Sequence, residues 1–209
     1  MKFESLIFDI DGTLWDTRAV AAASYNRVTA EAGYPFLAVT AEQLAAQFGK
    51  PPAEIADVVF APVPAPERYR LMDRCVARSL EDFAAEPALE GYPGVVETLT
   101  ALAQDHRLFI VSNSEKGYPE LTKKKLGISH LISGHLCNGD TGLGKGQNLL
   151  YLMKQYRIES CAYIGDTQGD YLATVEAGIP FIWCAYGFGS PAGYLAKIHR
   201  FSDLTALET

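Results

Sequence analysis

The stretch Phe8-Asp9-Ile10-Asp11-Gly12-Thr13 stands at the end of a short apolar run, Ser5 to Phe8, and the rest of the chain can be interpreted from it. Such a run is typical of a buried parallel strand, and a glycine ends it. A plain polar turn would leave Asp9 unexplained, because a carboxylate at the end of an apolar strand is costly without a cation. Ligands of open α/β sheets gather beyond the carboxyl ends of the strands. The stretch is therefore a candidate reaction centre.

Length and composition limit the classes of protein. The 209 residues suffice for one full core, or for one core plus a modest insertion. With 48% hydrophobic and 21% charged residues the chain is typical of a soluble globular protein. Its net charge of −7 argues against binding to a nucleic-acid backbone, and the run Lys123-Lys124-Lys125 is too short to change that.

Two further observations concern location. No apolar run approaches the roughly 18 residues of a membrane span. The start of the chain also lacks a signal-peptide pattern, because Asp9 and Asp11 interrupt the only apolar candidate. We therefore expect a cytoplasmic protein that does not bind membranes. The pattern indicates no oligomeric state.

The chain changes character twice. Residues 16–88 lack strand-like runs and are rich in Ala, Glu, Leu and Arg at helical spacing, which predicts an all-helical insertion. Residues 1–15 and 89–209 instead alternate strands with helices. We predict an α/β fold in which helices flank a Rossmann-like parallel sheet, and an all-helical domain is inserted after the first strand.

The expected elements follow from periodicity and from helix start and stop signals. Beyond the first strand, the expected strands cover residues 108–111, 131–133, 161–164 and 181–184. The expected core helices cover residues 95–104, 118–126, 147–156 and 170–177. In the insertion, we expect helices over 19–32, from 40 to about 49, over 51–60 and over 67–84. Thr40 and Gln43 resemble a capping box at the start of the second of these.

Polar residues also follow two of the later strands. Ser112-Asn113-Ser114 comes after one apolar run, and Gly165-Asp166-Thr167-Gln168-Gly169-Asp170 comes after another. If the strands are parallel, these tips lie beside Asp9 and Asp11. A helix cap at Asp166 or Thr167 would explain one aspartate, but not acids at the tips of two separate strands.

Such a cluster of acids needs a cation. Two unit charges about 4 Å apart repel by roughly 4 kcal/mol at an effective dielectric near 20. Oxygen ligands without a His or Cys motif favour Mg²⁺, which commonly binds carboxylates together with a substrate phosphate. Lys145 precedes a predicted helix and could face an anion there. The stretch around it is not a P-loop, because Gly146 stands where Ser or Thr is required, and EF-hand and dinucleotide-binding patterns fail as well.

Taken together, Asp9-Ile10-Asp11-Gly12-Thr13, Ser112-Asn113, Lys145 and Gly165 to Asp170 resemble the four ordered motifs of the haloacid dehalogenase superfamily. The helical insertion and the returning Tyr92-Pro93-Gly94 resemble its phosphoglycolate-phosphatase-like branch, which carries an α-helical cap. The resemblance covers nearly the whole chain. One departure is Gly146, because many relatives have a proline after the motif lysine.

This resemblance implies a Mg²⁺-dependent phosphatase that hydrolyses a small phosphorylated metabolite, such as phosphoglycolate, through an aspartyl phosphate. Asp9 would be the nucleophile, and Asp11 the acid and base. The implied phosphate-binding residues are Ser112, Asn113 and Lys145. The implied metal ligands are Asp9, the carbonyl of Asp11, Asp166 and Asp170, the last directly or through water. In the cap, Lys50, Arg18 and Arg27 are candidates for contact with a second anionic group of the substrate.

Three alternatives are weaker. A dehalogenase would resemble this chain in fold but would lack the acid at Asp11. A phosphosugar mutase would carry a histidine in the first cap helix, and this chain has none there. A catalytically retired member that only binds a phosphorylated ligand would not need Asp11.

Overall fold

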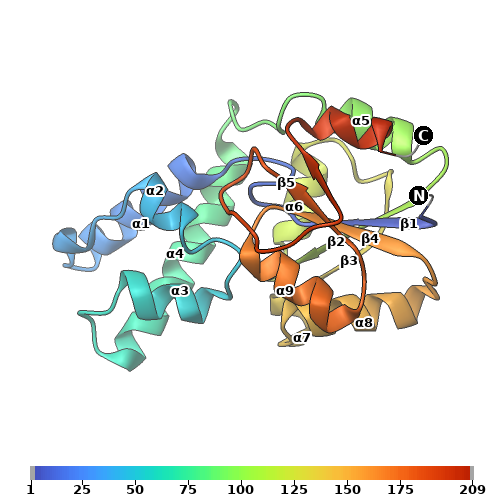
Figure 1. Ribbon diagram of the computed structural model, residues 1–209. Coiled ribbons are helices and arrows are strands. Elements are labelled where there is room, and N and C mark those ends of the chain that lie inside the picture. Colours follow the sequence, from blue (N-terminus) through green and yellow to red (C-terminus); the bar gives the residue numbers. More distant parts are fainter. Residues whose placement is uncertain (1–2, 208–209) are drawn as a thin grey trace. The chain divides into compact units, whose positions relative to one another are not determined.

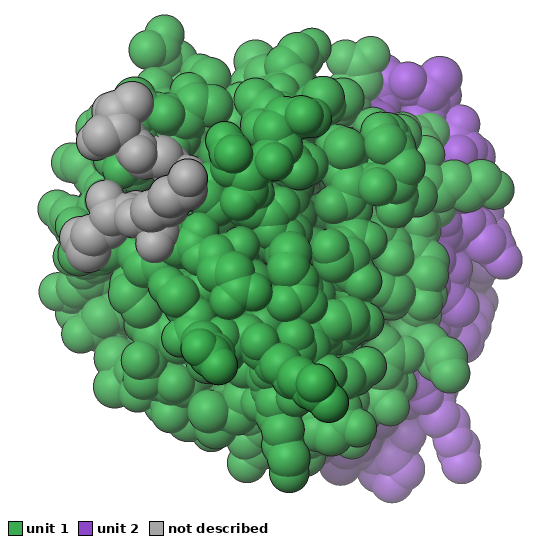
Figure 2. All heavy atoms as spheres, turned by 90° about the vertical axis from the view of Figure 1, so that its right-hand side faces the viewer, with its two compact units in different colours: residues 1–16, 90–209 green, residues 17–89 purple. Residues whose placement is uncertain are grey.

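The structure is a computed structural model that describes residues 3–207 (Figure 1). The chain divides into two compact units (Figure 2). Unit 1 comprises residues 1–16 and 90–209, and unit 2 comprises residues 17–89. Among the described residues, every helix is too short or too polar to cross a bilayer.

Unit 1 contains one six-stranded sheet in which every neighbouring pair is parallel. The strands are β1 (Ser5–Phe8), β2 (Arg107–Ser112), β3 (Ile132–Cys137), β4 (Cys161–Gly165), β5 (Phe181–Cys184) and β6 (Ala196–Ile198). Their order is β3-β2-β1-β4-β5-β6. The chain proceeds outward from β1 first on one side and then on the other, so the carboxyl end of β1 is the switch point at which such sheets bind ligands.

The strand register brings three polar tips to one level. Phe8, the last residue of β1, pairs with Ile110 of β2 and with Ile164 of β4. The backbone N–H of Asp9 donates to the carbonyl of Ile164 at 2.9 Å. Ser112 and Asp166 each come two residues after the partners of Phe8, so they lie at the same edge of the sheet as Asp9.

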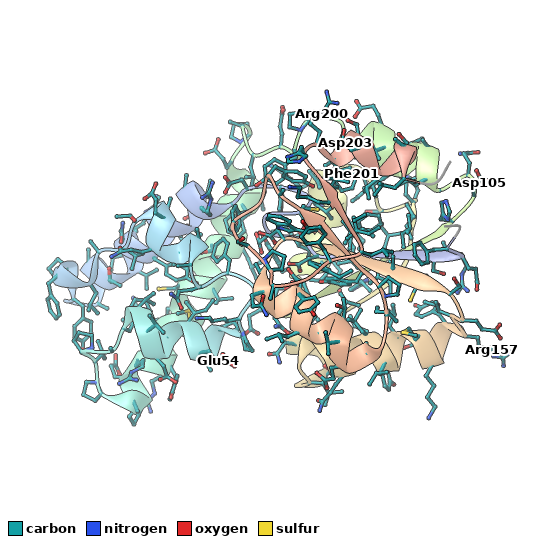
Figure 3. All side chains as sticks on the ribbon, viewed as in Figure 1. Glu54, Asp105, Arg157, Arg200, Phe201 and Asp203 are labelled. Carbon is teal, nitrogen blue, oxygen red and sulfur yellow. The ribbon has the colours of Figure 1, made fainter. Side chains whose placement is uncertain are left out.

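Helices cover both faces of the sheet, so the predicted α/β fold is confirmed. They are α5 (Val95–Leu102), α6 (Tyr118–Lys125), α7 (Asn138–Thr141), α8 (Lys145–Tyr156), α9 (Gln168–Ala177) and the 3₁₀ helix η2 (Phe201–Ala206). Ile7 belongs to a buried cluster with Leu149 of α8 and Ala173 of α9. The next residue, Phe8, faces the other way, and its ring lies 5.8 Å between centroids from that of Phe201, which is labelled in Figure 3. This alternation is what buries a central strand on both sides.

Three short elements of unit 1 were not predicted: β6, α7 and η2. The strand β6 has three residues, too few to show a period of two. The helix η2 is capped by Asp203, whose carboxylate accepts the backbone N–H groups of His199 and Arg200 at 3.0 Å each (Figure 3). The predicted strand 131–133 is longer than expected and extends to Cys137.

Unit 2 is all-helical, as predicted. It contains α1 (Arg18–Glu31), the 3₁₀ helix η1 (Pro35–Leu37), α2 (Ala41–Ala45), α3 (Pro52–Val59) and α4 (Ala65–Ala85). The capping box predicted from Thr40 and Gln43 is present at the start of α2, with bonds of 3.2 and 2.8 Å. The predicted end of that helix near Gly49 is wrong, because α2 stops at Ala45 and the chain continues in turns to Gly49, which has φ +88°.

Candidate active site

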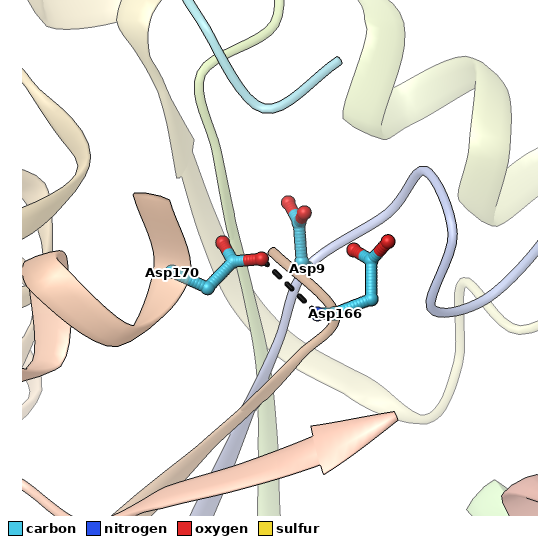
Figure 4. A group of neighbouring side chains, drawn as sticks. All are labelled: Asp9, Asp166 and Asp170. Carbon is cyan, nitrogen blue, oxygen red and sulfur yellow. Dashed lines mark hydrogen bonds between the residues drawn. The ribbon is translucent and has the colours of Figure 1, made fainter. Parts of the chain in front are cut away.

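Three buried carboxylates meet at the carboxyl edge of the sheet (Figure 4). Asp9 follows β1, Asp166 follows β4, and Asp170 lies in the first turn of α9. All three are at most 2% exposed, and oxygens from each lie within 4.8 Å of one another. The structure therefore brings together acids that are 157 and 161 positions apart in sequence, since 166 − 9 = 157 and 170 − 9 = 161.

Lys145, the first residue of α8, supplies the cation within this cluster. Its Nζ lies 2.9 Å from Asp9 Oδ1 and 2.5 Å from Asp170 Oδ1, and the residue is 3% exposed. A Cβ at the next residue, Gly146, would overlap the carboxylate of Glu176 on α9, an exposed side chain that can move aside.

Asp170 is held by donors on both of its oxygens. Asp170 Oδ2 accepts the N–H of Asp166 at 3.1 Å (Figure 4), and both the N–H and Oγ1 of Thr167 at 2.8 Å. Oδ1 accepts from Lys145 and, at 3.4 Å, from the hydroxyl of Tyr163. Thr167 and Asp170 also form the capping box of α9, so the helix-cap interpretation and the cluster coexist. Burial alone would raise the pKa of Asp170, but Lys145 and Thr167 outweigh it and hold that pKa below its ordinary value.

Among the described residues, Asp166 is held through one of its two oxygens. Its Oδ2 accepts the backbone N–H of Phe188 at 2.6 Å. Gly12, at φ +76°, and Gly187 both lie so close that a Cβ on either would overlap the Asp166 side chain. Within residues 3–207, Asp166 Oδ1 is buried and has no hydrogen-bond partner. An unpaired carboxylate oxygen in a buried site is costly, so this atom is suited to a cation.

The electrostatics of the cluster also fit a divalent cation. Burial raises the pKa of Asp9 to about 7, although Lys145 opposes the rise. Burial, together with Asp170 and Asp9, raises the pKa of Asp166 well above its ordinary value. Burial alone would lower the pKa of Lys145, but Asp170 and Asp9 outweigh it, so the ammonium stays charged. Three carboxylates therefore share one cation, and a hard divalent ion with oxygen ligands would balance the remaining charge.

The raised pKa of Asp9 predicts a pH-dependent stability of the metal-free protein. An acid whose folded pKa rises from 3.8 to about 7 contributes stability that is fully present below pH 3.8 and lost as pH rises through about 7. From about pH 5.5 to about pH 8, the unfolding free energy of the wild type should fall relative to Asp9→Asn by on the order of 1–3 kcal/mol. Urea unfolding in EDTA measures this difference. A difference that stays constant with pH would contradict the assignment, and saturating Mg²⁺ should abolish the slope.

Asp11, the second acid of the first motif, is oriented by an aromatic side chain. The hydroxyl of Tyr118, at the start of α6, donates to Asp11 Oδ1 at 2.6 Å. The indole N–H of Trp15 donates to the same hydroxyl at 3.1 Å. Tyr118 could not be predicted as a site residue, because a tyrosine at the start of a helix carries no sequence signal that separates it from an ordinary core aromatic.

The second motif lies at the same edge. Ser112 is the last residue of β2, the strand beside β1, and is 5% exposed. Its Oγ accepts the backbone N–H of Ser114 at 3.2 Å, which shapes the turn that begins with Asn113. This turn is a polar loop one strand away from Asp9.

The three candidates for a second anionic contact belong to unit 2. Arg18 is the first residue of α1. Arg27 Nη1 lies 3.6 Å from Asp82 Oδ1 of α4. Lys50 Nζ donates to Gln47 Oε1 at 2.9 Å at an exposed position. Arg27 and Lys50 thus have partners within their own unit.

Comparison with known proteins shows the family to which this chain belongs. Residues 6–184 match the haloacid dehalogenase-like hydrolase family, and the chain belongs to that family. It is 28% identical over 190 residues to a phosphoglycolate phosphatase of Agrobacterium fabrum, covering 87% of this chain and 80% of the relative. It is 29% identical over 195 residues to a phosphoglycolate phosphatase of Xanthomonas campestris, covering 90% and 86%. A crystal structure of a predicted phosphoglycolate phosphatase from Haemophilus somnus superposes with a TM-score of 0.86 at 22% identity, covering 100% and 99%. The resemblance to the phosphoglycolate-phosphatase-like branch is thereby confirmed.

Proposed function

We propose that this hydrolase is a Mg²⁺-dependent phosphatase that cleaves a small phosphomonoester similar to phosphoglycolate. The observation that carries the proposal is that Asp9 lies 2.9 Å from the ammonium of Lys145 and belongs to the same acid cluster as Asp166, whose Oδ1 has no partner among the described residues. Asp9 thereby has a cation beside it and a candidate cation site within its own cluster. An anionic phosphate can approach a carboxylate only where such positive charge offsets their repulsion.

In the proposed first step, a carboxylate oxygen of Asp9 attacks phosphorus. A bond forms between Asp9 and phosphorus as the bond to the leaving oxygen breaks, and Asp11 protonates that oxygen. In the second step, water attacks the phosphorus of the aspartyl phosphate and gives its proton to Asp11. Inorganic phosphate then leaves, and the Asp9 carboxylate is regenerated. Tyr118 keeps Asp11 oriented for both proton transfers.

The remaining roles follow from the donors on each group. Asp9, the carbonyl of Asp11 and Asp166 would hold Mg²⁺ directly. We assign Asp170 to hold it through water, because both of its oxygens already accept protein donors. When bound, the ion offsets negative charge on the transferring phosphoryl group. Ser112, the amide of Asn113 and Lys145 would hold the phosphoryl oxygens.

We assign the choice of substrate to unit 2, the all-helical unit. We propose that residues 16–88 form a cap domain that closes during turnover, because closure excludes water from a phosphoryl-transfer site. Arg18, Arg27 and Lys50 of this domain are the candidates that would contact a carboxylate on the substrate. The relatives named as phosphoglycolate phosphatases support a substrate with both a phosphate and a carboxylate.

The proposal is tested with purified protein and a panel of phosphorylated metabolites that includes phosphoglycolate, assayed with Mg²⁺ and with EDTA. Phosphate release that requires Mg²⁺ is the expected result. Isomerisation of a hexose 1-phosphate without phosphate release would indicate a phosphosugar mutase. Tight binding by calorimetry without turnover of any compound would indicate a ligand-binding protein. Either of the last two results would contradict the proposal.

Tyr118→Phe is expected to lower kcat about 3- to 10-fold, because the variant loses one hydrogen bond to Asp11, of about 0.5–1.5 kcal/mol. Affinity for Mg²⁺ should change less than kcat, because the Tyr118 hydroxyl bonds the side chain of Asp11 and not the carbonyl proposed as a ligand. Tyr151→Phe is the matched control, because Tyr151 lies on α8 with 53% exposure. A kcat in Tyr118→Phe equal to that of the wild type would argue against the orienting role.

A further inference from the structure

A third segment contacts the two loops that carry the acids of the site, the loop after β1 and the loop after β4. This segment, Tyr186-Gly187-Phe188, follows β5. The Tyr186 hydroxyl donates to the carbonyl oxygen of Thr13 at 2.8 Å, in the turn that carries Asp9 and Asp11. The Phe188 N–H donates to Asp166 Oδ2 at 2.6 Å. One short segment therefore links the loop after β1 to the loop after β4.

The segment is itself fixed at the end of the sheet. The N–H of Ala185 donates to the carbonyl of Ile198 on β6 at 2.9 Å, and the N–H of Gly187 donates to the carbonyl of Cys184 on β5 at 3.1 Å. The ring of Tyr186 packs edge-on against Tyr92 at 4.9 Å between centroids. These contacts determine where the Tyr186 hydroxyl lies.

Close approach at Gly187 is required for this arrangement. A Cβ at Gly187 would overlap both the side chain of Asp166 and the carbonyl oxygen of Gly12. Glycine thus lets the backbone come near enough for Phe188 N–H to reach Asp166 Oδ2. With that oxygen held, Asp166 Oδ1 is the buried oxygen that has no donor among the described residues.

We propose that Tyr186-Gly187-Phe188 is a positioning segment that sets the metal affinity of the site. Its backbone fixes which oxygen of Asp166 is offered to the ion. The Tyr186 hydroxyl holds the turn of Asp9 and Asp11 in register with that oxygen. Tyr186 acts through other residues and has no contact with substrate in this role. The inference rests on the proposed function, because it assumes that the acids bind Mg²⁺.

The test is a calorimetric titration with Mg²⁺ of the full chain, at a temperature where all variants are folded. Tyr186→Phe should bind Mg²⁺ about 3- to 10-fold more weakly, the effect of losing one hydrogen bond. Tyr194→Phe is the matched control and should bind within about 2-fold of the wild type, because Tyr194 is 48% exposed and packs on Trp183. Gly187→Ala should weaken binding more than Tyr186→Phe, with circular dichroism used to check that it folds.

Thermal unfolding separates positioning from general stabilisation. If Tyr186 only stabilises the fold, Tyr186→Phe lowers Tm equally with and without Mg²⁺ and binds the ion as the wild type does, and the inference is overturned. If the inference holds, the gain in Tm from Mg²⁺ is smaller in Tyr186→Phe than in the wild type. Failure of the wild type to bind Mg²⁺ would overturn the proposed cofactor as well, whereas binding by the wild type with equal binding by Tyr186→Phe overturns the positioning role alone.

Discussion

Asp9→Asn is expected to lower phosphatase turnover by about 10⁴-fold or more, the scale of loss when a catalytic nucleophile is removed. Asparagine has the same shape, but its amide is a poor nucleophile. The substitution also removes the charge that attracts Lys145 at 2.9 Å. The measurement is the steady-state release of phosphate from the best substrate of the panel, at saturating Mg²⁺.

The matched control is Asp105→Asn, at an exposed position (Figure 3). It makes the same chemical change on the surface and should retain full activity. Circular dichroism and Tm show whether the Asp9 variant is folded. Turnover by folded Asp9→Asn within about 10-fold of the wild type would mean that water, not Asp9, attacks phosphorus.

Asp11→Asn is expected to separate the two chemical steps. With p-nitrophenyl phosphate the leaving group needs no proton, so the first step should proceed at a substantial rate without an acid. The second step needs a base for the attacking water, and its loss should lower steady-state turnover by about 10²- to 10⁴-fold. Rapid mixing should therefore show a burst of nitrophenolate of about one equivalent, followed by slow release.

The wild type is the first control for this experiment, because both steps are fast and no burst of that size is expected. The second control is a natural substrate with a poor leaving group. With this substrate Asp11→Asn should show no burst of product, because the first step then needs the acid. Slow release of nitrophenolate from the first turnover in Asp11→Asn would show that the first step also depends on Asp11, and would contradict the expected separation of the two steps. Equal rates in variant and wild type would remove Asp11 from the mechanism.

The acids of the site could be predicted because each stands where a local pattern breaks. Asp9 directly follows an apolar run and Asp166 follows another after one glycine, and a parallel sheet brings such tips to one edge. The register of β1 with its neighbours β2 and β4 then places the two acids at the same level of that edge. Lys145 was predicted from its place before a helix, and the pairing of one lysine with both Asp9 and Asp170 emerged only in the structure.

The supporting contacts could not be predicted, for physical reasons. The donor to Asp166 is the backbone N–H of Phe188, and a backbone group has no residue type that a pattern could reveal. Tyr118 and Tyr186 use a hydroxyl on a largely apolar side chain, so the sequence shows them as core aromatics. Gly187 resembles an ordinary turn glycine in the sequence. Glycine is needed because a Cβ would overlap the side chain of Asp166, which lies 21 positions earlier, since 187 − 166 = 21.

The proposed mechanism requires that the phosphoryl group is transferred to Asp9. Borohydride reduces an acyl phosphate but leaves a free carboxylate intact, so it marks the residue that carries the phosphoryl group. Asp11→Asn, mixed with p-nitrophenyl phosphate and Mg²⁺, quenched and treated with borohydride, should yield a peptide in which Asp9 has become homoserine by mass spectrometry. An unmodified Asp9 in a sample that has released one equivalent of nitrophenolate, or homoserine at another aspartate, would contradict phosphoryl transfer to Asp9.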